Sequence, residues 1–293
     1  MMPSSDAAQP PPHSVRRGRP PAPISPDAGP LHRAWLEPVR NVYFTSGLTQ
    51  DDLVDRSGYS KTRISELLRG NGYYPPWEIT FSVIHALGMP TPPMVRLWKA
   101  AALEADKGPE WIRQCIEQVA HEAEGPPLPY QAFTETMHRP YLEYARAFLL
   151  TDRRARGVVA ETNDILWLSW KEATASENLN RYAWLLLRSR VMLRAARDGG
   201  RPDLRAAVFS TREIRAHQDP GRMVALSELT DLFDAVSRLP DDQMDVAVLH
   251  YLCGIPDQRI PDVLGLSPAI AHAVDHHARA TVEALLGIPD TRE

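Results

Sequence analysis

The 293-residue sequence predicts an all-α protein. Apolar residues recur at spacings of three and four along most of the chain, which is typical of amphipathic helices. No run alternates convincingly between apolar and polar side chains, so no sheet is expected. Stretches rich in proline and glycine interrupt the helical patterns and divide the chain into successive units.

The first and clearest interruptions lie at the start of the chain and after residue 124. Residues 1–30 hold nine prolines and few large apolar side chains, and Gly125-Pro-Pro-Leu-Pro129 is the clearest linker. The expected organisation is a disordered Pro/Arg-rich tail (1–30), a helix-turn-helix domain with extra helices (31–124), a linker (125–129), a second helical domain (130–198), a linker (199–222) and a third helical domain (223–288). In the second domain we expect helices over about 153–173 and 178–197.

The stretch Thr49–Gly70, TQDDLVDRSGYSKTRISELLRG, predicts two short helices around a tight turn. Thr49 can cap the first helix and Ser60 the second. Gly58 falls in the turn, where a left-handed backbone favours glycine, and Gly70 ends the second helix. This is the spacing of a helix-turn-helix.

The second helix of this pair separates apolar from polar side chains. Ile64, Leu67 and Leu68 share one face. The polar residues left over are Ser60, Lys61, Thr62, Arg63, Glu66 and Arg69. Such a face at the start of a second helix suits contacts with base edges and phosphates of double-stranded DNA. The alternative is a plain helical hairpin with a solvated polar face.

The region from Leu31 to about Trp98 resembles the Xre/Cro-type helix-turn-helix domain of bacterial regulators. The segments SGLTQDDLVDRSGYSKTRISELLRG and PPWEITFSVIHALG carry the resemblance. It implies a bacterial DNA-binding transcription regulator. We also expect a homodimer, because one such domain buries little surface on DNA.

The N-terminal tail contains Arg17-Gly18-Arg19-Pro20, preceded by Arg16. This tetrapeptide resembles the core of an AT-hook, which lays arginines in a narrow minor groove. Arg16, Arg17 and Arg19 are therefore candidates for a minor-groove arm. The alternative is a solvated tail whose composition is simply rich in proline and arginine.

The two later units together resemble a bacterial sigma factor of the extracytoplasmic-function type, with sigma-2-like and sigma-4-like parts. Three segments carry the resemblance. The polymerase-clasping helix is similar to RARGVVAETNDILWLSW, and the helix facing the −10 element is similar to YAWLLLRSRVMLRAAR. The sigma-4 domain is similar to VAVLHYLCGIPDQRIPDVLGLS. The resemblance implies contacts with the RNA polymerase core or the promoter through Glu161, Trp167, Arg188, Arg190 and Arg194.

Charge is distributed unevenly along the chain. Residues 130–222 carry 16 basic and 11 acidic side chains, whereas residues 223–293 carry 4 basic and 12 acidic ones. The sigma-4 reading helix normally carries a lysine and an arginine, but Ile270 to Asp275 offers none. We expect the acidic last domain to be repelled by DNA and to bind a protein instead, such as an anti-sigma factor.

Several other classes of protein are disfavoured. Cys115 and Cys253 lie far apart in helical patterns, which suggests reduced thiols in a cytoplasmic protein, and no apolar run could span a membrane. His272 and His276 share a helix face, but no further metal ligands can be identified. No nucleophile elbow or phosphate loop is found, so no enzyme, metal or cofactor is expected.

The first functional hypothesis is therefore a transcription regulator that reads the major groove and uses its sigma-like part to contact RNA polymerase or another protein. One alternative is a working sigma factor that directs RNA polymerase to promoters. The other is a protein-interaction module that has lost DNA binding.

Overall fold

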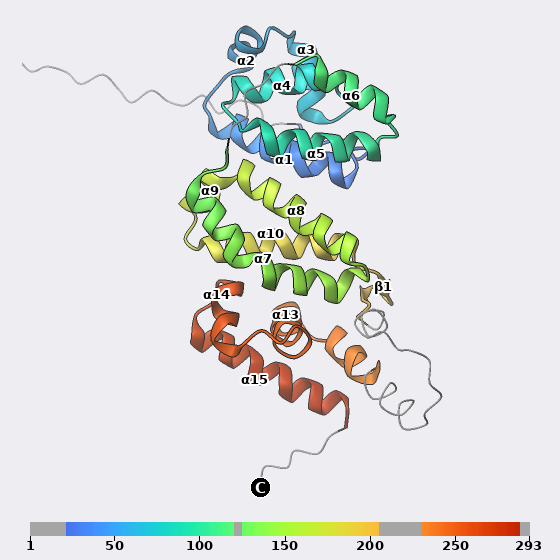
Figure 1. Ribbon diagram of the computed structural model, residues 1–293, viewed down its shortest axis with the longest axis vertical. Coiled ribbons are helices and arrows are strands. Elements are labelled where there is room, and N and C mark those ends of the chain that lie inside the picture. The colour runs from blue at the N-terminus through green and yellow to red at the C-terminus, as the bar shows by residue number, and fades with distance from the viewer. Residues whose placement is uncertain (1–21, 120–124, 205–229, 288–293) are drawn as a thin grey trace, which may run out of the picture.

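A computed structural model describes residues 22–119, 125–204 and 230–287. The described chain is mostly helical, which confirms the all-α prediction. Its helices form three groups stacked along the long axis of the molecule (Figure 1). We call them the head (22–119), the middle layer (125–204) and the last layer (230–287). Among the described residues, no helix combines the length and apolar character needed to cross a membrane.

The head is a bundle of six helices around a tryptophan-rich core. Its helices are α1 (Pro30–Thr45), α2 (Gln50–Ser57), α3 (Lys61–Arg69), α4 (Trp77–Ala86), α5 (Thr91–Glu104) and α6 (Pro109–Glu117). Trp35, Trp77 and Trp98 are completely buried, and Trp98 stacks on Trp111 with ring centroids 5.6 Å apart. Burying such large aromatic surfaces supplies much of the driving force for folding this small bundle.

The carboxylate of Glu104, at the end of α5, caps the N-terminus of α1. The backbone N–H groups of Leu31 and His32 donate to this carboxylate over 3.0–3.1 Å. The first N–H groups of a helix lack partners within it, and a negative charge there is favourable. Glu104 therefore supplies a long-range cap that local sequence rules do not reveal.

The middle layer contains α7 (Leu128–Leu149), α8 (Asp152–Leu168), α9 (Trp170–Ala175) and α10 (Leu179–Arg194). The expectation of one helix over 153–173 is wrong, because the chain leaves helical geometry at Ser169 (φ −100°, ψ 14°). The helix expected to reach residue 197 ends at Arg194. A hairpin of β1 (Arg197–Asp198) and β2 (Arg201–Pro202) follows, which the sequence did not predict.

The last layer begins with a helical segment over 230–237. It continues through α13 (Asp241–Ala247), the π-helical turn η1 (Val248–Leu252), the 3-10 turn η2 (Asp257–Arg259), α14 (Ile260–Leu264) and the long α15 (Pro268–Leu285). Gly265 adopts φ +63° between α14 and α15, a left-handed backbone conformation that glycine adopts without strain.

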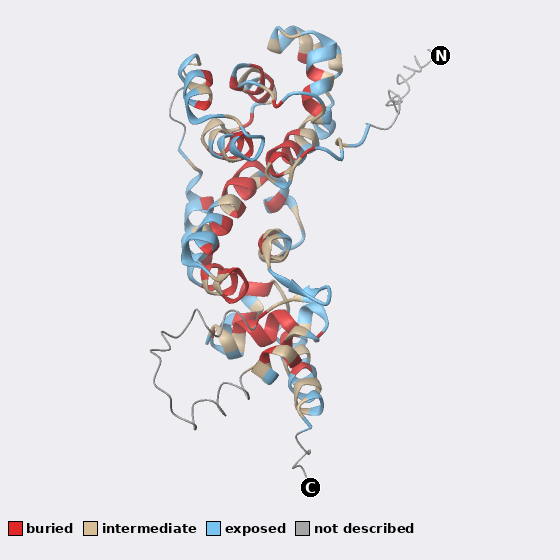
Figure 2. Cartoon of the chain, turned by 90° about the vertical axis from the view of Figure 1, so that its right-hand side faces the viewer, coloured by how far each residue is buried: buried red, intermediate tan, exposed pale blue. Residues whose placement is uncertain are grey.

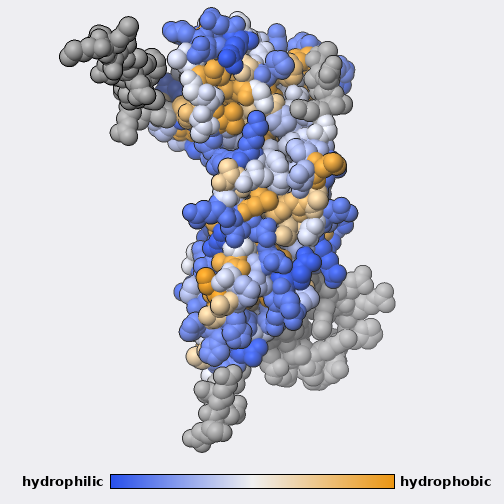
Figure 3. Space-filling model, turned by 90° about the vertical axis from the view of Figure 1, so that its left-hand side faces the viewer, coloured by the Kyte–Doolittle hydropathy of each residue, from blue (hydrophilic) through white to orange (hydrophobic). Residues whose placement is uncertain are grey.

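Two hydrophobic cores hold the three groups together. One runs continuously through the middle and last layers, and the other fills the head and also includes Ile165 and Leu168 of α8. Helix α8 thus has buried residues toward both cores (Figure 2). The molecule narrows where the head meets the middle layer, and hydrophobic patches lie above and below this waist on the face shown in Figure 3. The second and third predicted units therefore share one core.

Candidate nucleic-acid interface

Helices α2 and α3 form the expected helix-turn-helix, with each local signal in place. The Thr49 side chain accepts from Asp52 N, and the Asp52 carboxylate accepts from Thr49 N over 2.7 Å, which completes a capping box. The hydrogen bonds from Thr49 lower the pKa of Asp52. Gly58 has φ +74° in the turn, and the Ser60 hydroxyl accepts from Arg63 N. These local predictions are confirmed.

Helix α3 buries its apolar face and leaves its polar face open. Ile64, Leu67 and Leu68 pack into the head core. All six predicted DNA-contacting residues are exposed, and they are Ser60, Lys61, Thr62, Arg63, Glu66 and Arg69. The structure therefore brings these side chains together on one free surface of a single helix.

Three of these side chains, Lys61, Arg63 and Glu66, take part in ion pairs on the protein surface. Lys61 Nζ lies 2.5 Å from Asp51 Oδ1, and Arg63 Nη1 lies 4.0 Å from Glu66 Oε2. All four groups are well exposed, so each pair contributes little to stability and a phosphate can replace the carboxylate. The Gln50 side chain also donates to the Lys61 carbonyl over 2.9 Å, which ties α2 to the start of α3.

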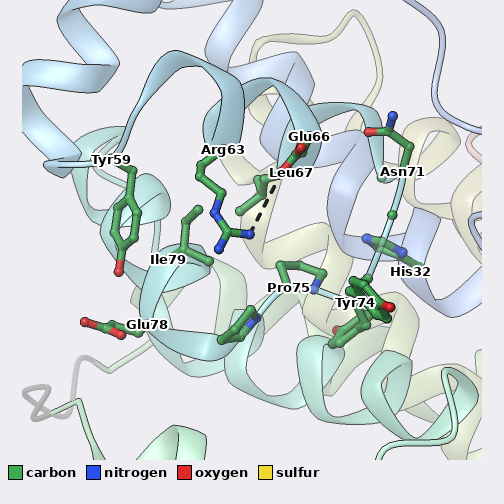
Figure 4. Close-up of a pocket in the computed structure, with 14 residues that line it drawn as sticks. His32, Tyr59, Arg63, Glu66, Leu67, Asn71, Tyr74, Pro75, Glu78 and Ile79 are labelled. Carbon is green, nitrogen blue, oxygen red and sulfur yellow. Dashed lines mark ion pairs between the residues drawn. The ribbon is translucent and has the colours of Figure 1, made fainter.

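A hollow of about 380 Å³ lies beside α3, bordered by the loop that leads to α4. Figure 4 shows Arg63 extending from α3 across this hollow, whose lining includes Leu67, Pro75 and Ile79. Tyr73 also lines it and is 95% exposed.

Arg40 on α1 holds the far end of α3 in place. Its Nη1 donates to the Leu68 carbonyl over 2.5 Å, and its Nη2 donates to the Ala22 carbonyl over 2.7 Å. Because carbonyls at a helix C-terminus lack partners within the helix, a guanidinium is favourable there. Sequence reasoning missed this positioning residue, since 28 positions separate Arg40 from Leu68.

Helix α3 lies at the end of the molecule remote from the middle layer (Figure 1). The head contacts α8 through α1 and α5, whereas α3 contacts α1 and α2. Within the part of the chain that the structure describes, the middle and last layers therefore do not cover the exposed face of α3.

The residues predicted to contact polymerase or promoter instead contact other helices of the same chain. Arg194 Nη2 donates to Glu161 Oε2 over 2.6 Å. Arg190 Nη2 lies 3.8 Å from Glu37 Oε2 of the head, and Arg190 Nε lies 4.0 Å from Glu161 Oε1. Burial raises the pKa of Glu161, and both arginines oppose that shift. The buried Trp167 has its ring centroid 5.6 Å from that of Tyr130. The predicted contacts stay a prediction, and they would require these internal pairs to open.

Arg188 joins the middle layer to the last layer. Its Nε donates to Asp245 Oδ2 over 2.7 Å, and its Nη2 lies 2.9 Å from Asp241. The Asp245 carboxylate, which is 1% exposed, also accepts from Tyr144 Oη and Trp184 Nε1. Burial raises the pKa of Asp245 to about 6 despite these partners.

The remaining sequence predictions concern the N-terminal arginines, the candidate metal ligands and the two cysteines. Arg16, Arg17 and Arg19 lie outside the described residues. Asp275, near the two histidines considered as metal ligands, instead hydrogen-bonds His250 and Tyr251. Within residues 22–119, 125–204 and 230–287, no three His, Cys, Asp or Glu side chains are placed to hold a metal ion. Cys115 and Cys253 are both free thiols.

No protein-family model matches the sequence, and comparisons with curated proteins and with solved structures find no significant match.

Proposed function

We propose that the protein is a cytoplasmic transcription regulator that binds double-stranded DNA through α3. The observation that carries the proposal is the free polar face of α3, with six exposed residues, on a helix-turn-helix whose caps and turn are all formed. A recognition helix needs such a face to enter the major groove.

The chemistry of this face divides into two kinds of contact. Lys61 and Arg69 would reach phosphates, which position the protein without selecting a sequence. Arg63, with its side chain 70% exposed, can present a guanidinium to O6 and N7 of guanine, and Thr62 can contact a thymine methyl group. On binding, DNA would replace Asp51 as the partner of Lys61 and Glu66 as the partner of Arg63.

The rest of the chain serves, in this proposal, as a sigma-like module that contacts RNA polymerase or another protein. The resemblance of the two later units supports polymerase as a partner. The last layer supports a protein partner of basic character, because residues 230–287 hold nine acidic and three basic side chains. A surface of that sign is attracted to basic partners and repelled by DNA.

A protein-interaction module without DNA binding is the second candidate. It is favoured by a hollow of about 380 Å³ in the last layer, lined by Val246, Ile260 and Ala271 and bordered by Asp257 and Asp275. An apolar floor with an acidic rim suits a basic, partly apolar protein segment.

Selection of duplexes from a random pool with the purified full-length chain tests the proposal. We expect a discrete consensus, and we expect Arg63→Ala to relax the preference at one or two base pairs. The matched control is Lys171→Ala, which removes an exposed positive charge from α9 of the middle layer. Failure to enrich any sequence, together with retention of a protein partner, would favour the second candidate.

Genome-wide crosslinking of the tagged chain separates the regulator from a working sigma factor. Peaks away from −10 elements are expected for a regulator. Peaks that coincide with RNA polymerase would favour the sigma-factor alternative.

A further inference from the structure

The hollow beside α3 has the size and lining of a small-molecule site. Its volume of about 380 Å³ falls within the range of about 300–1,000 Å³ that is usual for ligand pockets. The wall comes from α1, α3, α4 and the loop between α3 and α4, and its apolar and aromatic part includes Leu67, Tyr74, Pro75 and Ile79. Such a wall suits one aromatic ring, and the few polar groups around it determine which ligand would fit.

A buried histidine offers the hollow a polar atom without a partner. His32 of α1 lines the hollow and is 8% exposed. Figure 4 shows its ring reaching from α1 toward the hollow, and its Cε1 would lie 3.5 Å from a Cβ added at Gly70. Burial lowers the pKa of His32 to about 4, so its imidazole is neutral at pH 7. His32 Nε2 has no hydrogen-bond partner among the described residues, which costs free energy for a buried polar atom.

Asn71 provides a second polar atom of this kind. Its Oδ1 is also buried without a partner in the described part of the chain, although its backbone N–H donates to the Glu66 carbonyl over 3.4 Å. Figure 4 shows Asn71 near His32 where the chain leaves α3. A hydroxyl group both donates and accepts, so it suits the amide oxygen and either tautomer of the imidazole. A ligand whose ring carries a hydroxyl can therefore satisfy atoms that the protein leaves unpaired.

The α3 side of the hollow carries charges of both signs. Arg63 Nη1 and Glu66 Oε2 are 4.0 Å apart, and their side chains are 70% and 50% exposed, so separating them costs little. A zwitterion can lie between them, with its carboxylate on Arg63 and its ammonium group on Glu66. Each group would then gain a shorter charge-assisted hydrogen bond than the present pair provides. The exposed Glu78 also borders the hollow and favours a ligand that carries an ammonium group over a simple anion.

We propose that the hollow binds a small aromatic α-amino acid with a ring hydroxyl, and that this ligand weakens DNA binding by occupying Arg63. The ring lies against Pro75 and Ile79, and the hydroxyl faces His32 and Asn71. This inference rests on the proposed function, in which Arg63 contacts guanine. One guanidinium cannot pair with the ligand carboxylate and with a base edge at the same time, so the ligand acts as a regulator of the recognition helix.

Calorimetric titration of the full-length chain without DNA tests ligand binding by itself. The main probe is L-tyrosine, and each of three further probes lacks one of its groups. L-phenylalanine lacks the ring hydroxyl, tyramine lacks the carboxylate, and 3-(4-hydroxyphenyl)propionate lacks the ammonium group. We expect L-tyrosine to bind with a Kd below about 1 mM and each other probe to bind at least about fivefold more weakly, because each leaves a polar group of the site unpaired.

Two variants separate the proposed contacts from effects on folding. His32→Phe and Asn71→Ala should each weaken the binding of L-tyrosine at least about fivefold and leave that of L-phenylalanine almost unchanged, because L-phenylalanine has no hydroxyl to lose a partner. A variant that had merely lost its fold would lose both amino acids together. The matched control His85→Phe makes the same replacement at an exposed position of α4 outside the hollow, and it should bind L-tyrosine as the wild-type chain does.

Fluorescence anisotropy with the selected duplex, at constant ionic strength, measures the effect on DNA binding. Saturating L-tyrosine should lower the affinity for the duplex about tenfold, and by linkage the duplex should weaken the binding of L-tyrosine by the same factor. Tyramine at the same concentration should leave the DNA affinity unchanged, because it has no carboxylate for Arg63.

Three results would overturn the inference: no saturable binding of L-tyrosine, equal binding of all four probes, or binding of L-tyrosine without any change in DNA affinity. In each case, specific binding of the duplex by the wild-type chain and its loss in Lys61→Ala/Arg63→Ala would leave the assignment of α3 intact. If the wild-type chain binds no duplex specifically, the proposed function fails, and the regulatory part of this inference fails with it.

Discussion

Arg96 of the head and Asp164 of the middle layer form a two-point ion pair. Arg96 Nη2 lies 2.6 Å and Nε 2.9 Å from Asp164 Oδ1, and Nε also donates to Oδ2 over 3.1 Å. The guanidinium also lies 5.9 Å from the Trp167 ring. Burial raises the pKa of Asp164, and Arg96 opposes that shift. This pair is a principal polar link across the waist between the head and α8.

Removing one partner of this link should destabilise the protein. We expect Arg96→Ala to lower the free energy of unfolding by about 1–2 kcal/mol, less than for a fully buried pair because the Arg96 side chain is 53% exposed. Urea titration measures the change. In a double-mutant cycle with Asp164→Asn, strictly additive losses would contradict a direct interaction.

The buried Asp245 should make stability fall as pH rises through its folded pKa. Its pKa is raised to about 6 by burial, so the folded state holds a proton that the unfolded state releases near pH 4. Its stabilising contribution is fully present below about pH 4 and is lost by about pH 6, an effect of about 3 kcal/mol. Asp245→Asn should remove this trend and so gain stability, relative to wild type, between pH 4 and pH 7. A constant difference between the two proteins across that range would contradict the assignment.

His32 should act in the opposite direction. Burial, followed by the nearby charge of Arg33, lowers the pKa of His32 to about 4. Its contribution is therefore present above about pH 6.5 and is lost as pH falls toward 4, again about 3 kcal/mol. His32→Phe keeps a ring for the contacts with Trp35 and Tyr74. Between pH 7 and pH 5 the urea midpoint of His32→Phe should then fall less than that of the wild-type chain. An equal fall in the two proteins would argue against a buried neutral imidazole.

Gly265 allows the last layer to approach α10 closely. A Cβ at this position would lie 2.2 Å from the backbone N of Arg181, and its φ is +63°. Gly254 has the same φ with nothing within 4 Å of an added Cβ, so it serves as the matched control. We expect Gly254→Ala to cost about 1 kcal/mol for the backbone and Gly265→Ala about 1–3 kcal/mol more for the clash. Equal losses in thermal or urea unfolding would mean that the close approach does not matter.

The parts of the fold that sequence predicted correctly depend on interactions between near neighbours. Each cap or turn residue acts on neighbours within about one helical turn, so residue types and spacing are enough to place α2 and α3. These residues are Thr49, Gly58, Ser60 and Gly70. The exposed face of α3 follows from the same periodicity. The break at Ser169 has no such signal, because neither glycine nor proline marks it.

The interactions that sequence could not reveal join residues far apart in the chain. Arg188 and Asp245 are separated by 57 positions and Arg96 and Asp164 by 68. The sequence shows that the middle of the chain is basic and its end acidic, but it does not show that these charges meet. Read along the sequence, Arg188, Arg190 and Arg194 therefore suggested a surface for polymerase or DNA, whereas in the fold they bridge elements of the same chain.

The dependence of DNA affinity on salt concentration is the sharpest test of whether α3 binds DNA. Fluorescence anisotropy with a labelled duplex, measured from 50 to 200 mM salt, compares the wild-type chain with Lys61→Ala/Arg63→Ala and with the control Arg153→Ala/Lys171→Ala. Each lost phosphate contact should lower the slope of log Kd against log salt by about 0.9. We predict weaker binding and a slope reduced by between one and two such steps in the α3 variant, with the control unchanged. Identical affinities and slopes for the wild-type chain and the α3 variant would contradict the claim.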